Sequence, residues 1–223
     1  RFTVTAVDAS LKPALASSIA KYHMTEFART IVNDAMDIHG GRGIQMGPRN
    51  YLAQGYIAIP ISITVEGANI LTRNLILFGQ GAVRCHPYLR DEMDAITKKD
   101  MVSLDKLLIE HFSYSFKNLL KTFSFAFGLG HFFVDTPIKE LSYYYRQISR
   151  LSAALALVTD FTLIILGGSL KRKERLSARL GDVLSYLYMA SSVVRYVQDY
   201  PSSEEDRVYA QWGLDYCLYH IQY

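Results

Sequence analysis

Apolar residues return at steps of three and four along most of the chain. Between Pro13 and about Ile38 this spacing predicts one amphipathic helix, which Gly40 and Gly41 end. The same spacing predicts four later helices, over residues 104–129, 141–166, 174–199 and 204–221, which are separated by glycine pairs and by Pro201. The pattern therefore predicts an all-α fold.

The segment between the first helix and the later ones is less regular. It opens with the breaker-rich sequence GGRGIQMGPRN, and Pro60 follows, which argues against a continuous helix there. We expect the β-branched run at 61–65 to be an extended connector, because no neighbouring segment offers a strand to pair with it. A further helix is expected from near residue 66 to residue 78, with glycines after it.

A polar and charged stretch divides the later part of the chain. We expect residues 91–103 to be a linker between a helical bundle at 1–90 and a second bundle at 104–223. The most apolar stretch, 151–170, approaches the roughly 20 residues that a membrane span needs. Asp160 lies at its centre, which favours a buried helix because an aspartate is costly in lipid.

Composition narrows the class of protein. Half of the residues are hydrophobic and a fifth are charged, as in soluble globular proteins, and a net charge of +3 gives no argument for nucleic acid binding. The two cysteines are far apart and the histidines are scattered, so we predict no metal site and a cytoplasmic location. The first residues, RFTVTAVDASLKPA, lack an initiating Met and a signal sequence, and they indicate a chain that starts in mid-protein.

Two short segments contain candidate functional residues. The first is DIHGGRGI at residues 37–44, where three glycines in four positions exceed what a helix end requires. Glycines let a backbone approach a ligand closely and point its N–H groups at an anion. A plain helix terminator with a tight turn is the alternative, and the spacing alone favours it.

The second segment is ITVEGAN, in which Glu66 follows the β-branched run and precedes Gly67. Apolar surroundings destabilise the charged form of a glutamate, which suits a general base that works near neutral pH. The alternative is an ordinary glutamate in the first turn of a helix, where it stabilises the positive end of the dipole. The residues alone favour that alternative.

Taken in this order, the two segments resemble the C-terminal part of acyl-CoA dehydrogenases. Members of that family carry a Gln-x-x-Gly-Gly-x-Gly-aromatic motif and then an aromatic-Glu-Gly-Thr motif that opens a helix. This chain has DIHGGRGI and VEGANILTR in those places, with AKYHMTE upstream of both and NLILFGQGAVRCHPYL directly after the second. The segments YYRQISRLSAALAL and LGGSLKRKERLSARLGDVLS resemble the C-terminal extension of the long-chain bacterial, FadE-like branch.

The resemblance implies an acyl-CoA dehydrogenase C-terminal helical bundle followed by a second helical bundle. It implies an FAD enzyme of β-oxidation that converts long-chain acyl-CoA to trans-2-enoyl-CoA, forms a homo-oligomer and passes electrons to an acceptor protein. Glu66 takes the position of the catalytic base and Gly67 the position beside the substrate thioester. The positions that contact FAD are Ala68, Asn69 and Ile70, and those that contact the FAD of a neighbouring subunit run from Asp37 through Gly40 to Gly41.

Departures of the chain from the family pattern include three positions. Asp37 stands for the usual Gln, Ala68 for Thr, and Ile44 for the aromatic residue. An acid is a poor neighbour for a pyrophosphate, and Arg42 is close enough in sequence to compensate it. The family's N-terminal and middle domains hold most of the flavin, and they lie outside these residues. We therefore expect these 223 residues to be inactive alone.

Two other functions stay open at this point. An acyl-CoA oxidase shares the base and the flavin but passes electrons to oxygen. A non-catalytic helical module for oligomerisation or membrane docking is the other alternative. A basic cluster supports peripheral contact with the inner face of a membrane, because Arg172, Arg175 and Arg179 are expected on one helix face. A solvated helix face explains the same cluster, and the sequence favours it.

Overall fold

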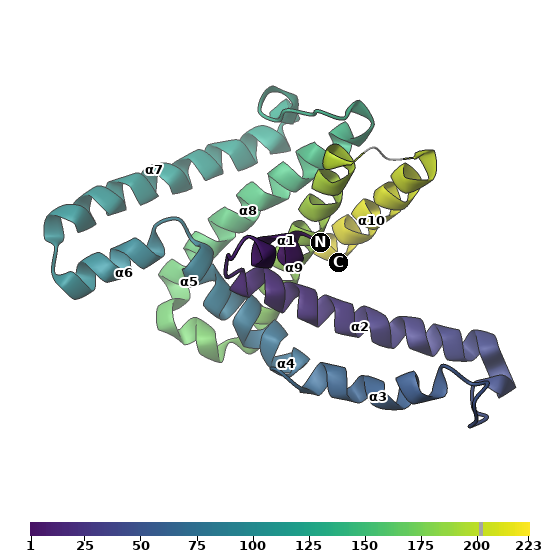
Figure 1. Ribbon diagram of the computed structural model, residues 1–223. Helices are drawn as coiled ribbons and strands as arrows, with labels where there is room; N and C mark the ends of the chain where they lie inside the picture. The colour runs from purple at the N-terminus through teal and green to yellow at the C-terminus, as the bar shows by residue number, and fades with distance from the viewer. Residues whose placement is uncertain (201–202) are drawn as a thin grey trace. The chain divides into compact units, whose positions relative to one another are not determined.

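The computed structural model describes residues 1–200 and 203–223, except for the side chain of residue 131. Every regular element in this part of the chain is a helix, which confirms the all-α prediction (Figure 1). The chain forms two compact units, Arg1–Ile76 and Leu77–Tyr223. Pro201, expected to separate the last two helices, lies outside the described residues.

Unit 1 is built on two helices that pack along each other, α2 (Ala14–His39) and α3 (Ala53–Thr64) (Figure 1). The short α1 (Phe2–Asp8) precedes them, and η1 (Gly40–Arg42) and α4 (Asn69–Leu71) follow α2 and α3 respectively. The predicted first helix is confirmed as α2. It ends at Gly40, whose φ of 53° lies in the left-handed region that favours glycine.

Helix α3 contradicts the expectation of an extended connector at 61–65, since residues 61–64 are helical and only Val65 is extended. The helix continues through Pro60, which removes one backbone hydrogen bond without ending the helix. The hydroxyl of Thr64 donates to the carbonyl of Pro60 at 2.9 Å, in the turn that follows the proline. The expectation was wrong because it treated proline as a complete block to the helix.

The helix expected from residue 66 is also different in the structure. It begins three residues later with α4 and widens into the π-helix η2 (Thr72–Gln80). It then runs without a break into α5 (Gly81–Cys85), so the glycines after residue 78 do not end it. Gly79 and Gly81 lie within the helical run because a glycine lowers helix propensity without blocking the hydrogen bonds.

Unit 2 contains the four long helices that the spacing predicted. They are α7 (Met101–Ala126), α8 (Ser142–Leu166), α9 (Glu174–Asp199) and α10 (Glu204–Gln222), joined by the short segments η3 (Leu129–Phe132), η4 (Lys139–Leu141) and η5 (Gly167–Arg172). Helix α10 packs on α9, α7 packs on α8, and α8 contacts α9. The main core lies between α8, α9 and α10 and includes Leu141, Ala190, Val194 and Leu214.

The expected linker at 91–103 is a helix and a tight turn. Helix α6 (Leu89–Lys98) fills most of it and packs against α7, with Glu92 and Ala95 buried. Lys99 then turns the chain in the left-handed conformation, and the carboxylate of Asp100 caps α7. The polar residues belong to the exposed face of a helix, and the boundary between the two compact units falls between residues 76 and 77 of the sequence instead.

Helix α8 was expected to be buried, and it is buried along one side only. The buried residues include Ala153, Thr159 and Asp160, whereas Ile164 and Ile165 are largely exposed. The helical stretch Lys139–Arg172 is long and apolar enough to cross a membrane, and only 17% of its most apolar window is buried. A single helix of this kind is weak evidence for a membrane span.

Candidate active site

The turn between α3 and α4 places Glu66 in an unusual backbone conformation. The φ angles of Glu66 and Gly67 are 55° and 90°, both in the left-handed half of conformational space. Ser10 and Lys99 also have positive φ, but there the residue and its successor donate backbone bonds into the preceding helical turn. No such pair of bonds closes a helix end at Glu66 in the described residues.

A set of hydrogen bonds ties this turn to helix α2. The ammonium group of Lys21 donates to the carbonyl of Gly67 at 2.9 Å and to the side-chain oxygen of Asn69 at 2.6 Å. The amide nitrogen of Asn69 donates to Thr25 and to Glu26, each at 2.8 Å. Since Asn69 is buried, these bonds fix where the Glu66 turn lies on α2.

The side chain of Glu66 is exposed, which contradicts the expectation of apolar surroundings. The preceding β-branched residues form the end of α3 and its C-cap Val65, and Ile61 and Val65 are themselves exposed. They do not pack around the carboxylate, because a helix distributes successive side chains around its axis. In the described chain, the turn positions Glu66 and does not bury it.

The predicted cofactor residues near Glu66 differ from one another in exposure. Ile70 is 72% exposed, and Ala68 and Gly67 are half-buried. The side chain of Asn69 is fully engaged with α2, so only its backbone is left for a cofactor. Asn69 therefore has a structural role that the sequence did not indicate.

The fold explains why glycine occurs at some positions of the DIHGGRGI segment and not at others. Gly40 has the positive φ that ends α2. A Cβ on Gly43 would lie 3.2 Å from the carbonyl oxygen of Gly40 and 3.2 Å from the end of Met36, so this position is closely packed. Gly41 has neither a positive φ nor any atom within 4 Å of an added Cβ. Gly41 is thus the glycine that packing within this chain does not explain.

Asn50 holds the loop that follows these glycines. Its amide nitrogen donates to three backbone carbonyls, and its oxygen accepts from two backbone N–H groups at the start of α3, with the partners Arg42, Gly43, Gln45, Leu52 and Ala53. His39 donates to the carbonyl of Ala35 and accepts from the hydroxyl of Tyr51. The loop is therefore ordered by its own polar side chains.

The two predicted motifs lie apart on unit 1. Asp37 is exposed, and no ion pair joins it to Arg42 in the described structure, so the expected compensation is absent. Helix α2 separates Asp37 from Glu26, which contacts Asn69, by about 16 Å along its axis at 1.5 Å per residue. The structure does not bring the two segments together within one chain.

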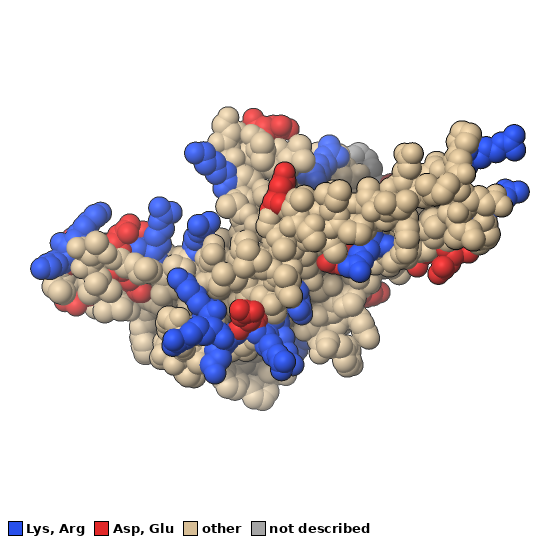
Figure 2. Space-filling view, turned by 90° about the horizontal axis from the view of Figure 1, so that it is seen from below, with Lys and Arg blue, Asp and Glu red and all other residues tan. Residues whose placement is uncertain are grey.

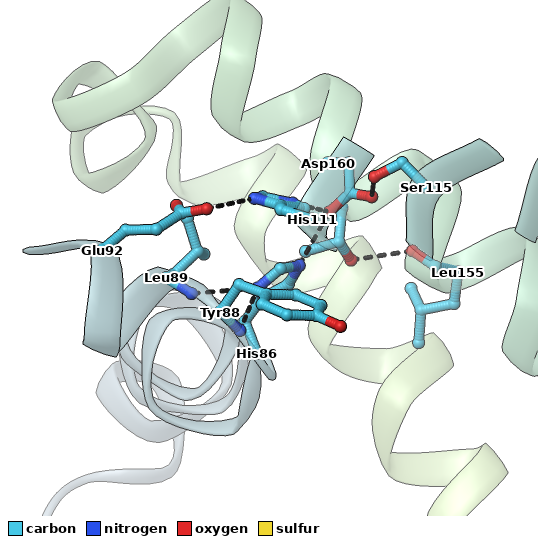
Figure 3. A network of polar contacts seen from close by, with 9 residues as sticks. His86, Tyr88, Leu89, Glu92, His111, Ser115, Leu155 and Asp160 are labelled. Carbon is cyan, nitrogen blue, oxygen red and sulfur yellow. Dashed lines mark hydrogen bonds and ion pairs between the residues drawn. The ribbon is translucent and has the colours of Figure 1, made fainter. Parts of the chain in front are cut away.

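A second polar cluster lies within unit 2, where α6, α7 and α8 meet (Figure 3). The Nε2 atom of His86 lies 2.8 Å from Oδ1 of Asp160, and the hydroxyl of Ser115 donates to Oδ2 at 2.6 Å. The ring of His111 lies between two carboxylates, at 2.7 Å from Glu92 and 3.5 Å from Asp160. Residues that are scattered in sequence therefore form one network, which sequence reasoning missed.

Three of these side chains are close enough to share a metal ion. The ligand atoms of His86, His111 and Asp160 lie within 4.8 Å of one another. However, Nδ1 of His86 accepts the backbone N–H groups of Tyr88 and Leu89, each at 3.2 Å. A neutral ring that accepts at Nδ1 carries its proton on Nε2, which then donates to Asp160 and has no lone pair for a metal. Hydrogen bonding therefore accounts for this cluster.

Asp160 is ionised within this network. Burial raises the pKa of a carboxyl group, but the bonds from His86, Ser115 and His111 outweigh it, so the pKa of Asp160 lies below its ordinary value. Both nitrogens of His86 and both of His111 already have partners. Neither ring has a free nitrogen for a substrate, so the network connects three helices and is not a second catalytic centre.

The residues that sequence reasoning missed have weak signals in the sequence. Lys21 and Thr25 are spaced at i and i+4, which places them on one face of α2. This spacing does not indicate which residue they contact. An aspartate inside the most apolar stretch was the signal for the second network, because a buried charge needs partners. Those partners come from residues 45 to 74 positions away.

Comparison with known proteins supports the resemblance along the chain. The family model described as "Acyl-CoA dehydrogenase, C-terminal domain" matches residues 1–79. A second model, "Acyl-CoA dehydrogenase, C-terminal, bacterial type", matches residues 83–223. No solved structure matches the chain. The chain therefore belongs to the acyl-CoA dehydrogenase family, with both the general C-terminal domain and the bacterial-type C-terminal domain.

Proposed function

We propose that this chain is the catalytic C-terminal part of an FAD-dependent acyl-CoA dehydrogenase, in which Glu66 removes the α-proton of a long-chain acyl-CoA. The product is the trans-2-enoyl-CoA of the first step of β-oxidation. The observation that carries this proposal is the left-handed backbone at Glu66, held on α2 by Lys21 and Asn69. The family match supports it and does not favour an oxidase or a non-catalytic module.

The backbone at Glu66 has an energetic cost that suits an active site. A non-glycine residue in the left-handed region costs on the order of 1 kcal/mol, and it persists only where surrounding contacts enforce it. Here the bond from Lys21 to the carbonyl of Gly67 and the bonds of buried Asn69 enforce it. Such residues cluster at active sites, so the strain is a positional argument for Glu66 as a reactive group.

The residues of the turn have separate roles in the proposed reaction. The carboxylate of Glu66 accepts the α-proton, and its backbone N–H donates to the thioester carbonyl, which makes that proton more acidic. At Gly67 a φ of 90° would strain any other residue, and the missing side chain leaves room beside the thioester. Lys21 acts through the backbone of Gly67 and is a positioning residue.

The residues predicted to contact FAD fit the cofactor in part. Gly41 offers an exposed backbone with open space beside it, and Ile70 offers an exposed apolar side chain to a ring system. Asp37 does not fit a pyrophosphate, since it is exposed and no cation pairs with it in the described residues. When bound, FAD accepts the hydride from the β-carbon, and an electron-transfer protein reoxidises it.

The separation of the two motifs along α2 supports a homo-oligomeric site. Ala68 and Ile70 would contact one flavin, and Gly40 and Gly41 would contact the flavin of a neighbouring subunit. The carboxylate of Glu66 is exposed in the described residues, so the proposal requires other parts of the full-length enzyme to exclude water from it. We therefore propose that the 223 residues alone are inactive and purify without flavin absorbance.

The decisive variant is Glu66→Gln in the full-length enzyme. Glutamine keeps the shape of the side chain but cannot accept the proton, so anaerobic flavin reduction by acyl-CoA should fall about a thousandfold. FAD content should stay unchanged, which absorbance measures in the same sample. Asp34→Asn is the control, because it removes another exposed carboxylate from unit 1. Reduction by Glu66→Gln at close to the normal rate would show that Glu66 is not the base.

A further inference from the structure

A pocket of about 630 Å³ lies in unit 2 between α5, α6, the end of α8 and η5. Its wall is mainly apolar, with Leu89, Met93, Leu163 and Leu170 among the lining residues. Two cationic side chains, Arg84 and Lys171, also line it, and no acidic residue does. This volume is within the range of small-molecule sites, and the lining suits an apolar chain that carries an anionic group.

The cations of the pocket continue into a larger basic surface. Lys171 is followed by exposed Arg172, Lys173 and Arg175, and Arg179 is exposed one turn further along α9. Figure 2, which looks onto the molecule from below, shows a group of Lys and Arg side chains with few acidic ones among them. Arg172 lies in η5, so only Arg175 and Arg179 share a face of α9, which corrects the expectation from the sequence.

These cations have no acidic partners in the part of the chain that the structure describes. No hydrogen bond or ion pair engages Arg84, or the basic residues between Lys171 and Arg179. Lys173 and Arg175 also lie at the start of α9, where the helix dipole is positive and added positive charge is unfavourable. Anions bound on this surface would relieve both the mutual repulsion and the unfavourable dipole.

Large apolar side chains project beside the same pocket. Ile164 and Ile165 follow the lining residue Leu163 on the last turn of α8, and they are 79% and 74% exposed. Phe161 is exposed one turn earlier. Bulky apolar side chains next to a basic cluster are the combination that lets a protein bind a membrane interface through both charge and apolar contact.

We propose that this end of unit 2 is a binding site for anionic phospholipid at a membrane surface. One acyl chain of the phospholipid enters the apolar pocket, and the phosphate group of the same lipid lies between Arg84 and Lys171. The basic residues from Arg172 to Arg179 attract neighbouring headgroups, and Ile164 and Ile165 insert at the interface. The proposal does not rest on the role of Glu66, which lies in the other unit.

Vesicle co-sedimentation of the full-length protein tests the basic surface. The protein should sediment with vesicles that contain phosphatidylglycerol and not with phosphatidylcholine alone, and salt should weaken binding. Replacing Arg172, Arg175 and Arg179 together with Gln should reduce binding at least about tenfold. The matched control replaces Lys98, Lys117 and Lys139 with Gln. These lysines are exposed elsewhere on unit 2, and the control should retain most of the binding. Equal losses in both triple variants, or no sedimentation of the wild type, would overturn the proposal.

A glycine variant tests the pocket separately from the charge. An added Cβ on the lining residue Gly168 meets no atom within 4 Å, so Gly168→Leu extends into open space without a change in net charge. It should weaken binding to anionic vesicles severalfold while the circular dichroism spectrum stays unchanged. Gly213→Leu is the control, because Gly213 has equal space on α10 but does not line the pocket. Normal vesicle binding by Gly168→Leu would show that no lipid chain occupies the pocket.

Discussion

Glu66 in unit 1 and Asp160 in unit 2 are two carboxylates that the fold treats in opposite ways. Asp160 is buried and accepts bonds from Ser115 and His86, and its pKa is lowered by those bonds. Glu66 is exposed, and the backbone that carries it is strained and tied to α2. A carboxylate with every oxygen engaged stabilises the fold, whereas a positioned and exposed one is available for the proposed proton transfer.

The same contrast separates the polar residues around each carboxylate. His86 and His111 are of a residue type that often serves as an acid or base in catalysis, but their ring nitrogens are already engaged by protein groups. Lys21 and Asn69 contact the backbone of the Glu66 turn or one another and leave the carboxylate free. Residue type alone therefore does not separate the two centres, and the hydrogen-bond partners favour Glu66 as the proposed base.

Removing the buried carboxylate should produce a large loss of stability. Asp160→Ala leaves the ring of His86 and the hydroxyl of Ser115 without their acceptor inside the protein. We expect the free energy of unfolding of the full-length protein to fall by about 3 kcal/mol. Urea denaturation followed by circular dichroism measures this, with the exposed Asp105→Ala as the control. A change no larger than that of the control would show that the network does not stabilise the fold.

Releasing the Glu66 turn should lower the rate without removing the base. Lys21→Met deletes the bonds to Gly67 and to Asn69, so the carboxylate is less well positioned over the substrate. A misplacement of about 1 Å can cost up to a hundredfold, and we expect a loss of about thirtyfold in flavin reduction. The pH dependence of the remaining reduction should be unchanged, because the same group still accepts the proton. Lys12→Met, at an exposed lysine just before α2, should reduce flavin normally.

The lowered pKa of Asp160 predicts a loss of stability in acid. A group with a depressed folded-state pKa contributes its full stabilisation above its unfolded value of about 3.9. This contribution is lost as the pH falls through the lower folded-state pKa. Urea midpoints measured from about pH 5 to about pH 3 should therefore fall more steeply in the wild type than in Asp160→Asn. Parallel curves for the two proteins would mean that Asp160 does not titrate as described.

The smallest expected effect on folding is at Gly41. An alanine there meets no atom within 4 Å and needs no positive φ, so the free energy of unfolding should change by no more than about 0.5 kcal/mol. FAD binding by the full-length enzyme should nevertheless weaken, because the backbone could no longer approach the cofactor closely. Gly43→Ala gives the opposite comparison, since its Cβ meets Gly40 and Met36. Unchanged flavin affinity in Gly41→Ala would remove Gly41 from the cofactor site.

The helices were predictable from sequence to the extent that apolar spacing and caps determine them. The range 174–199 was predicted as the structure shows it for α9, because both its ends are marked by charged and breaker residues. The errors lie where a single residue was given too much weight. Pro60 does not interrupt α3, and the polar residues of 91–98 form the outer face of α6.

The proposal for Glu66 depends on the ordered motifs and the family resemblance they carry, because the residues alone favoured an ordinary glutamate in the first turn of a helix. The positive φ of Glu66 and its attachment to Lys21 depend on contacts across 46 residues, which local patterns do not contain. The network of His86, His111 and Asp160 was missed for the same reason, since its members come from three helical regions. Long-range pairing of polar groups is the part of this structure that the sequence does not reveal.

The contrast between the two carboxylates is tested most directly by the rate of flavin reduction per bound flavin in Glu66→Gln and Asp160→Asn. Both substitutions remove one negative charge and keep the side-chain shape. Glu66→Gln should keep its stability and lose about a thousandfold in rate, whereas Asp160→Asn should lose stability and keep the rate of its folded fraction. A normal rate in Glu66→Gln, or a lost rate in a fully stable Asp160→Asn, would contradict this assignment.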